Sequence, residues 1–281
     1  MSRIDLHTHT NFSDGSFSPT ALVKLAHQKG LHILAITDHD TTDGLTEAME
    51  ATQGLPLELI TGIELSTEFQ GRETHMLGYF IDLADLQFQA RLERLRATRL
   101  DRIHQILDRL HTLNMEISLA EVEHFAGSGT IGRPHIAQLL IDKGYVKGMK
   151  EAFERFLGVR GTAYVRRAVP EAAEIMTWIT DAGGIPILAH PYWEGMNADE
   201  TVVSCRKLVE QGLRGLEVFY GAFSARQISL NLQLTRQFSL LTTGGSDFHG
   251  TFRPDISIGT GRGSLNVPSK VIDHLRRAAG R

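Results

Sequence analysis

Short apolar runs alternate along much of the chain with longer segments whose apolar positions recur every three or four residues. In the first eighty residues, "RIDLHTH", "LHILAIT", "LELITGIELSTEF" and "ETHMLGYFI" predict strands, and residues 18–30 and 43–54 predict helices. After Tyr164 the alternation returns, with strands expected at "IPILAH", "LRGLEVF" and "LLTTGGSD". Alternating strands and helices favour parallel strands joined by right-handed crossovers, so we expect an α/β protein.

Residues 84–160 have a different pattern. The stretch "LQFQARLERLRATRLDRIHQILDRLHTLN" predicts one long helix, and shorter helical segments follow it. No strand pattern is evident in this range. We therefore expect a helical insertion subdomain at 84–160, with residues 1–83 and 161–281 forming the main domain.

The composition narrows the class of protein. The 281 residues are 42% hydrophobic and 22% charged, which is enough for a sizeable core. The net charge of −4 argues against a protein that coats nucleic acid. The single cysteine, Cys205, excludes a disulfide within the chain, and there is no secretory signal and no apolar run of membrane-spanning length. We expect a cytoplasmic protein with no membrane or protein partner.

Histidines and carboxylates cluster where the expected strands end. Because the carboxyl ends of parallel strands meet at one face, these side chains should converge in one pocket. Imidazole and carboxylate ligands suit zinc, manganese or iron, and the set is large enough for two or three ions. The candidates are His7, His9, Asp14, Asp38, His39, Glu64, His75, His190, Asp247 and His249.

Five short motifs carry a family resemblance. In chain order, "DLHTHTNFSDG", "AITDHDT", "GIELS", "LAHP" and "GSDFHG" resemble the PHP (polymerase and histidinol phosphatase) family of metal-dependent phosphoesterases. The resemblance implies a distorted (β/α)7 barrel with a helical insertion, and up to three divalent ions. Manganese is the first expectation, with iron or zinc as alternatives.

The resemblance also implies which residues hold each ion. One ion would be held by His7, His9, Glu64 and Asp247. Glu64 would bridge to a second ion, which His75 and His190 also bind. The third would be held by Asp14, His39 and His249.

Two further segments, "TIGRPHIAQLL" and "RFLGVRGTAYV", resemble the PHP subgroup that includes 3′,5′-nucleoside bisphosphate phosphatase and the 5′–3′ exoribonuclease RNase AM. Arg133 and His135 lie at an expected helix start, where a guanidinium and free amides suit a phosphate. Arg160 lies in a glycine-flanked loop that returns to the barrel. We expect all three to bind substrate.

The sequence departs from this subgroup at two places. Arg166 and Arg167 follow "AYV", where proline is usual, and Tyr192 and Trp193 follow "AHP", where glycine is common. The aromatic pair could form a platform for a base. The six arginines of residues 91–109 are interleaved with three acids, which predicts a solvated helix face rather than an RNA track.

These observations predict a phosphohydrolase that removes the 3′-phosphate from a nucleoside 3′,5′-bisphosphate. The near alternative is a 5′–3′ exoribonuclease acting on 5′-phosphorylated RNA, and histidinol-phosphatase-like activity is a weaker one. The alternative from another class is a non-catalytic metal-binding module that docks through its helical insertion. For proton transfer, the sequence leaves Asp38, His190, Asp247 and His249 as candidates.

Overall fold

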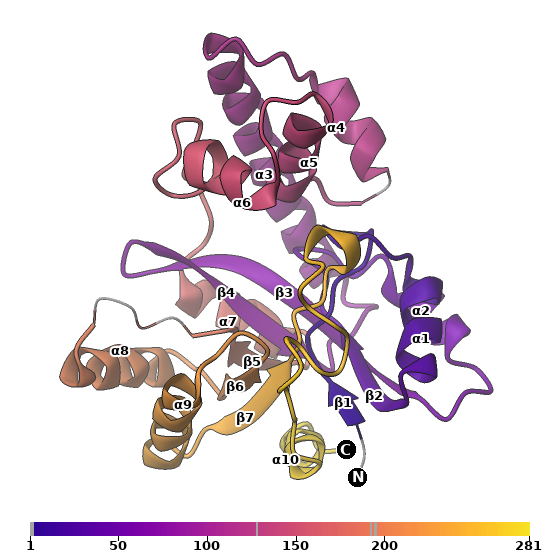
Figure 1. Ribbon diagram of the computed structural model, residues 1–281. Helices are drawn as coiled ribbons and strands as arrows, with labels where there is room; N and C mark the ends of the chain where they lie inside the picture. The colour runs from indigo at the N-terminus through magenta and orange to yellow at the C-terminus, as the bar shows by residue number, and fades with distance from the viewer. Residues whose placement is uncertain (1–2, 128, 192, 194–195) are drawn as a thin grey trace.

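The computed structural model describes residues 3–127, 129–191, 193 and 196–281 (Figure 1). Seven strands form one sheet in chain order. Their bounds are β1 Arg3–Asp5, β2 Leu31–Ile36, β3 Glu58–Phe69, β4 Arg72–Tyr79, β5 Ile185–Leu188, β6 Gly215–Tyr220 and β7 Leu241–Gly245.

The strands are not all parallel. β1, β2 and β3 are parallel to one another, as are β5, β6 and β7, but β4 is antiparallel to both of its neighbours. The parallel direction expected for every strand is therefore wrong for β4. The reason is the two-residue turn between β3 and β4, in which Gln70 and Gly71 both have positive φ, at 51° and 75°. Such a turn makes a hairpin and is too short for a crossover.

The two edges of the sheet lie beside each other. The Leu6 amide donates to the Gly244 carbonyl at 3.2 Å, and the Asp247 amide donates to the His7 carbonyl at 2.8 Å. Gly245 allows this approach, because a Cβ there would lie 2.3 Å from the Cβ of His7. These bonds replace a continuous ladder between β1 and β7, and the result is the expected distorted barrel.

Six helices pack around the sheet (Figure 1): α1 Pro19–Gln28, α2 Leu45–Ala51, α7 Ala172–Asp181, α8 Ala198–Glu210, α9 Ala225–Gln237 and α10 Lys270–Ala278. α1 begins as expected, because the Ser18 side chain accepts a hydrogen bond from the Ala21 amide and Pro19 opens the helix. Among the described residues, no helix is both long and apolar enough to cross a membrane.

A short 3-10 helix, Gly250–Phe252, follows β7. The helices between β4 and α7 stand together at one end of the molecule (Figure 1): α3 Leu86–Thr112, α4 Leu119–Ala126, α5 Arg133–Asp142, α6 Met149–Ala152 and the π-helical turn Phe153–Leu157. α3 joins this group to the barrel. Phe88 and Leu92 at its start belong to the barrel core, whereas Ile106 and Leu110 belong to an apolar cluster among the helices. The division of the chain at residue 84 stays a prediction, since α3 packs on both sides.

Candidate active site

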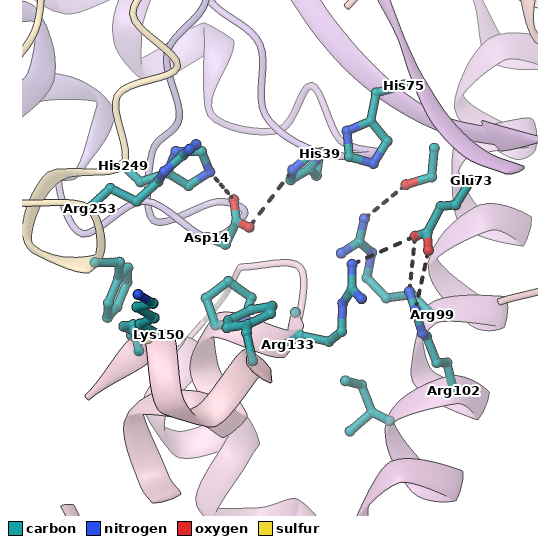
Figure 2. Close-up of a pocket in the computed structure, with 17 residues that line it drawn as sticks. Asp14, His39, Glu73, His75, Arg99, Arg102, Arg133, Lys150, His249 and Arg253 are labelled. Atoms are coloured by element: carbon teal, nitrogen blue, oxygen red, sulfur yellow. Dashed lines mark hydrogen bonds and ion pairs between the residues drawn. The ribbon is translucent and has the colours of Figure 1, made fainter. Parts of the chain in front are cut away.

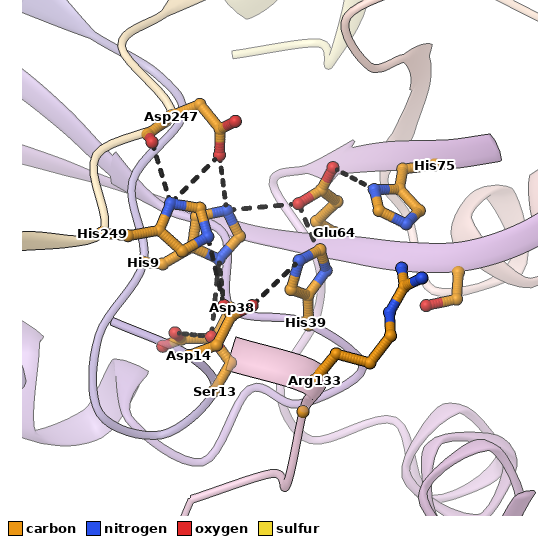
Figure 3. A network of polar contacts seen from close by, with 12 residues as sticks. His9, Ser13, Asp14, Asp38, His39, Glu64, His75, Arg133, Asp247 and His249 are labelled. Atoms are coloured by element: carbon orange, nitrogen blue, oxygen red, sulfur yellow. Dashed lines mark hydrogen bonds and ion pairs between the residues drawn. The ribbon is translucent and has the colours of Figure 1, made fainter. Parts of the chain in front are cut away.

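The expected ligands meet at one end of the sheet (Figure 3). Most follow directly after strands, but Glu64 lies within β3, because that strand continues to Phe69. His75 lies within the antiparallel β4. The others follow β1 (His7, His9, Asp14), β2 (His39), β5 (His190) and β7 (Asp247, His249).

Glu64 lies at the centre of this cluster and is 1% exposed. Its Oε1 is 3.0 Å from His75 Nδ1 and 2.9 Å from His190 Nε2. Its Oε2 is 3.2 Å from a ring nitrogen of each of three more histidines: His7, His9 and His39. A carboxylate shared in this way is suited to bridging between ions.

The potential ligand atoms fall into three overlapping groups, each within 4.8 Å. The groups are His7, His9, Glu64 and Asp247; His9, Asp14, His39 and His249; and His39, Glu64 and His75. The first is the set that the family resemblance implies for one ion. In the other two groups, His9 and His39 each lie beside ligands that the resemblance assigns to a different ion. Which ligands hold which ion therefore stays a prediction.

Unpaired polar atoms indicate that the residues fit metal ions. Nε2 of His9, Nδ1 of His39 and Oδ1 of Asp14 are buried, and although charged side chains lie 3.2 Å from each of them, none makes a well-aligned hydrogen bond with a described residue. Leaving such atoms unpaired is costly in a protein interior. Divalent cations would satisfy them, and would also balance the buried charges of Asp14, Glu64 and Asp247.

The surrounding charges shift the pKa values of side chains in the cluster. Burial raises the pKa of Glu64, but the neighbouring imidazoles bring it well below its usual range. Burial lowers the pKa of His7, but the carboxylates of Glu217, Glu64 and Asp247 raise it well above its usual range. Without metal, His7 therefore favours its protonated form beside the ionised Glu64, and metal binding at His7 must release a proton.

Glu217 on β6 supports the cluster, although the sequence analysis did not select it. It is fully buried, with Oε1 2.9 Å from His7 Nδ1, and Oε2 accepts a hydrogen bond from the His190 amide at 2.7 Å. By engaging Nδ1, it leaves Nε2 of His7 directed at Glu64 and Asp247. A single acid in the apolar strand "LEVF" was the available signal.

Replacing Glu217 with glutamine should weaken metal binding about 10- to 100-fold, because a carboxylate that orients a ligating histidine contributes about that factor. The measurement is metal affinity by competition with a chelator, on protein shown to be folded by circular dichroism. Glu210→Gln, at the exposed end of α8, is the control and should bind metal normally. Normal affinity in Glu217→Gln would show that His7 needs no such partner.

Asp38 is tied to the loop after β1. Its Oδ1 accepts hydrogen bonds from the Thr10 amide at 2.7 Å and the Ser13 hydroxyl at 2.6 Å, and its Oδ2 accepts from the Thr10 hydroxyl at 2.6 Å. Both oxygens are thus occupied in shaping the segment that carries His9 and Asp14. The proton-transfer role expected for Asp38 stays a prediction, and this geometry favours a positioning role.

Asp247 links the cluster to two neighbouring side chains. Its Oδ1 is 3.2 Å from His9 Nε2. Its Oδ2 accepts a hydrogen bond from the Tyr220 hydroxyl at 2.7 Å and is paired with Arg253. The backbone of Asp247 is left-handed, with φ of 58°, a costly conformation that is often found at functional sites.

A cavity of ≈ 450 Å³ opens beside the metal-ligand cluster. One wall carries ligand candidates Asp14, His39, His75 and His249, and the facing wall carries basic side chains from the helical group (Figure 2). The cations that line it are Arg99, Arg102, Arg133, Lys150 and Arg253. We call this space the arginine-rich cavity.

Arg133 is incompletely paired in the arginine-rich cavity. Glu73 binds Arg102 through two hydrogen bonds, at 3.1 and 3.4 Å, and lies 3.9 Å from Arg133. One carboxylate therefore serves two guanidinium groups. Burial and the charge of Arg102 lower the pKa of Arg133. Arg133 also donates a hydrogen bond to the Leu157 carbonyl at 3.2 Å, but no carboxylate contacts it closely among the described residues. A partly buried cation with so little charge compensation favours an anionic ligand.

The prediction of a solvated arginine face at 91–109 is wrong for two of its residues. Arg102 is only 6% exposed, and Arg99 pairs with the buried Asp40 at 2.6 Å. Asp40 also pairs with Arg167 at 2.7 Å. The departure noted after "AYV" thus has a structural role, since Arg167 helps to fix Arg99 beside the cavity.

Arg160 and His135 do not line the arginine-rich cavity. Arg160 is exposed in the loop after the π-helical turn. His135 is 3% exposed; its Nδ1 accepts a hydrogen bond from the Gly132 amide at 3.1 Å, and it borders a separate hollow with Phe125 and Phe252. Substrate binding by these two residues stays a prediction, and of the three expected residues only Arg133 lies in the cavity.

Trp193 borders a smaller recess of ≈ 180 Å³, together with Phe69, His75 and His190. Its indole N–H donates to Asn231 Oδ1 at 3.0 Å, which fixes the ring. The other residue of the expected aromatic platform, Tyr192, lies outside the described residues.

Comparisons with known proteins agree on the type of protein. The model of the PHP domain matches residues 5–184. A 5′-3′ exoribonuclease from Haemophilus influenzae is 34% identical over 88% of this chain and 90% of its own length. A 3′,5′-nucleoside bisphosphate phosphatase from Chromobacterium violaceum is 31% identical over 89% and 88%. The crystal structure of a putative metal-dependent phosphoesterase from Bifidobacterium adolescentis covers 98% of this chain and 96% of its own, with a TM-score of 0.89 and 30% identity.

Proposed function

The chain belongs to the PHP domain family and is a phosphoric ester hydrolase, and from this premise we propose that it removes the 3′-phosphate from nucleoside 3′,5′-bisphosphates. The products are the nucleoside 5′-monophosphate and inorganic phosphate. Supporting this, the relative from Chromobacterium violaceum carries that name. Because the chain is a phosphoric ester hydrolase, the alternative of a non-catalytic metal-binding module no longer applies.

The observation that carries the proposal is the position of the arginine-rich cavity. It opens onto the ligand candidates His39, His75 and His249, so a phosphate bound by its cations would lie next to the metal-ligand cluster. Two phosphate-binding environments side by side suit a substrate with two phosphates. Arg133 and Arg102 would hold the 5′-phosphate through charge-assisted hydrogen bonds, and the 3′-phosphate would enter the cluster.

Two or three divalent ions, manganese in the first instance, would supply a Lewis acid for the phosphoryl oxygens and lower the pKa of a coordinated water. The chain's own residues orient the ester and handle the proton. The His249 ring lies 2.9 Å from the Asp247 carbonyl through Nδ1, so that nitrogen donates and Nε2 faces Asp14 as a ligand.

His190 is then the best-placed proton carrier of the four candidates. Its side chain is 26% exposed, whereas those of Asp247 and His249 are each 7% exposed, so it can exchange protons with solvent. When the P–O3′ bond breaks, the departing O3′ must gain a proton, and we assign that transfer to His190 in place of the ligand role expected for it, because His190 belongs to none of the three ligand groups found among the described residues.

The test is phosphate release from adenosine 3′,5′-bisphosphate with added Mn²⁺, compared with 3′-AMP, 5′-AMP and a 5′-phosphorylated RNA oligomer. Fast turnover of the bisphosphate with little on either monophosphate supports the proposal. If the oligomer alone is degraded, the exoribonuclease function of the relative from Haemophilus influenzae applies instead. No turnover of any of them by metal-loaded protein would refute both.

Arg133→Gln should raise KM for the bisphosphate about 10- to 100-fold with a smaller change in kcat, because a hydrogen bond to a charged group contributes about 1.5–3 kcal/mol. Arg160→Gln is the matched comparison and should stay within about twofold of the unchanged enzyme, since Arg160 lies outside the cavity. The opposite ranking of the two variants would place the phosphate anchor in the loop and not on α5.

A further inference from the structure

The proposed bisphosphate substrate and the alternative substrate, 5′-phosphorylated RNA, differ in what is attached to the phosphorus whose ester bond is broken. Hydrolysis adds water to phosphorus, breaks the P–O3′ bond and leaves a protonated O3′. With a bisphosphate, the phosphorus leaves as inorganic phosphate. With 5′-phosphorylated RNA, it stays on the shortened chain as its new 5′-phosphate. Only the second reaction requires space for a nucleotide that is joined to the phosphorus and lies outside the arginine-rich cavity.

Such a space adjoins the metal-ligand cluster. A hollow of ≈ 260 Å³ lies at the turn between β6 and α9 and is lined by His190, Tyr220, Ala222, Phe223 and Gln227. It shares none of these lining residues with the arginine-rich cavity. We call it the Tyr220–Phe223 shelf.

Asp247 connects the two spaces. Its Oδ2 accepts a hydrogen bond from Tyr220, which lines the shelf, and pairs with Arg253, which lines the arginine-rich cavity. His190 lies on the shelf, with its ring centroid 5.4 Å from that of Tyr220, while its Nε2 contacts Glu64. A phosphate held at Glu64 and Asp247 would therefore have the cavity on one side and the shelf on another.

The shelf presents two packed aromatic rings. The rings of Tyr220 and Phe223 pack edge to face, with centroids 5.0 Å apart, and the Phe223 amide donates to the Tyr220 carbonyl at 3.0 Å. Gln227 is held by hydrogen bonds from the amide and hydroxyl of Ser224, at 2.9 and 2.7 Å. Phe223 remains partly exposed. A partly exposed aromatic ring that is packed in this way is suited to stacking against any nucleobase.

We infer that the Tyr220–Phe223 shelf binds the base of the second nucleotide of a 5′-phosphorylated RNA, the one attached to the scissile phosphorus. This inference rests on the proposed function for its placement of the first nucleotide in the arginine-rich cavity. It gives the site the chemistry of an exonuclease as well as that of a phosphatase. Stacking without base-specific hydrogen bonds makes the shelf tolerant of sequence.

Phe223→Ala tests the inference through a ratio of two substrates. The value of kcat/KM for a 5′-phosphorylated dinucleotide, divided by that for adenosine 3′,5′-bisphosphate, should fall about 5- to 100-fold, as expected for loss of one stacked base. Phe223→Trp keeps an aromatic ring at this position and should leave the ratio close to that of the unchanged enzyme. Phe125→Ala, which removes a 37% exposed aromatic ring on α4, should leave it unchanged. An unchanged ratio in Phe223→Ala would overturn the inference, and so would an equal loss on both substrates.

A binding measurement separates this inference from the proposed function. A 5′-phosphorylated oligomer with 2-aminopurine at its second position should lose fluorescence on binding, because the base stacks, and Phe223→Ala should abolish that loss. This readout needs no turnover. If the protein does not hydrolyse the bisphosphate but still quenches 2-aminopurine through Phe223, the proposed function fails and the shelf stands. Quenching that is independent of Phe223 removes the shelf, whatever the enzyme hydrolyses.

Discussion

Glu64→Gln is expected to lower hydrolysis of adenosine 3′,5′-bisphosphate by a factor on the order of 10³ or more. Glu64 is the only carboxylate among the described residues that contacts five histidines of the cluster, and it occurs in two of the three ligand groups. Its loss should disrupt two ion positions together. Metal ions contribute several kcal/mol to such reactions, and each 1.36 kcal/mol is tenfold in rate.

The measurement combines phosphate release with metal content after gel filtration. Bound metal should fall together with the activity. Glu68→Gln is the matched control on the same strand, because Glu68 pairs with Arg166 at 2.5 Å and lies outside the ligand groups. Full metal content and more than about a tenth of normal activity in Glu64→Gln would contradict a bridging role, on the same rate scale.

Asp40→Asn is expected to lower the free energy of unfolding by about 3–5 kcal/mol, the usual cost of removing one partner from a buried ion pair. Asp40 is fully buried and pairs with both Arg99 and Arg167, and it also accepts a hydrogen bond from the Ser66 amide at 2.9 Å. Asparagine keeps the shape but leaves two guanidinium groups without a counter-charge. Urea unfolding followed by circular dichroism measures the loss.

Asp40 also predicts how stability changes with pH. Burial raises the pKa of this carboxyl, but Arg167 and Arg99 hold it well below its usual range. A pKa that is lower in the folded state gives stability that is complete above the unfolded value of about 3.9 and is lost as the pH falls below it. The unchanged protein should therefore lose stability below about pH 4 more steeply than Asp40→Asn. Asp43→Asn, at an exposed position nearby, should behave like the unchanged protein. Equal acid sensitivity of the two asparagine variants would contradict this account.

The sequence was sufficient to locate the strands and the metal-ligand candidates, because most of these residues directly follow apolar runs. It could not give the direction of β4, since a strand of alternating residues reads the same whichever way it runs. Only the short turn at Gln70 and Gly71 indicates a hairpin. The role of Glu217 was missed because one acid within an apolar strand has no spacing pattern to mark it.

The arginines of α3 were misjudged for a different physical reason. Interleaved charges in a long helix usually face solvent, and Arg94 and Arg109 fit that expectation. Arg99 and Arg102 are three residues apart and so lie on one helix face. That face is directed towards the barrel, where Arg99 pairs with Asp40 and Arg102 pairs with Glu73. Both acids lie more than twenty residues from their arginine partners in the sequence. Tertiary contact, which no local pattern encodes, decided their burial.

The two walls of the arginine-rich cavity come from different parts of the chain: the metal-ligand wall from the barrel, and Arg102, Arg133 and Lys150 from the helices α3, α5 and α6. Under the proposed function, most of the cations that bind the 5′-phosphate and the residues that bind metal are therefore encoded in separate parts of the sequence. Substitutions in α3, α5 and α6 would change which phosphate-bearing molecule the arginine-rich cavity accepts and would leave the metal-ligand cluster unchanged. Such a separation of the metal-ligand wall from the helical wall is consistent with relatives that share phosphoester hydrolysis but are named for different substrates.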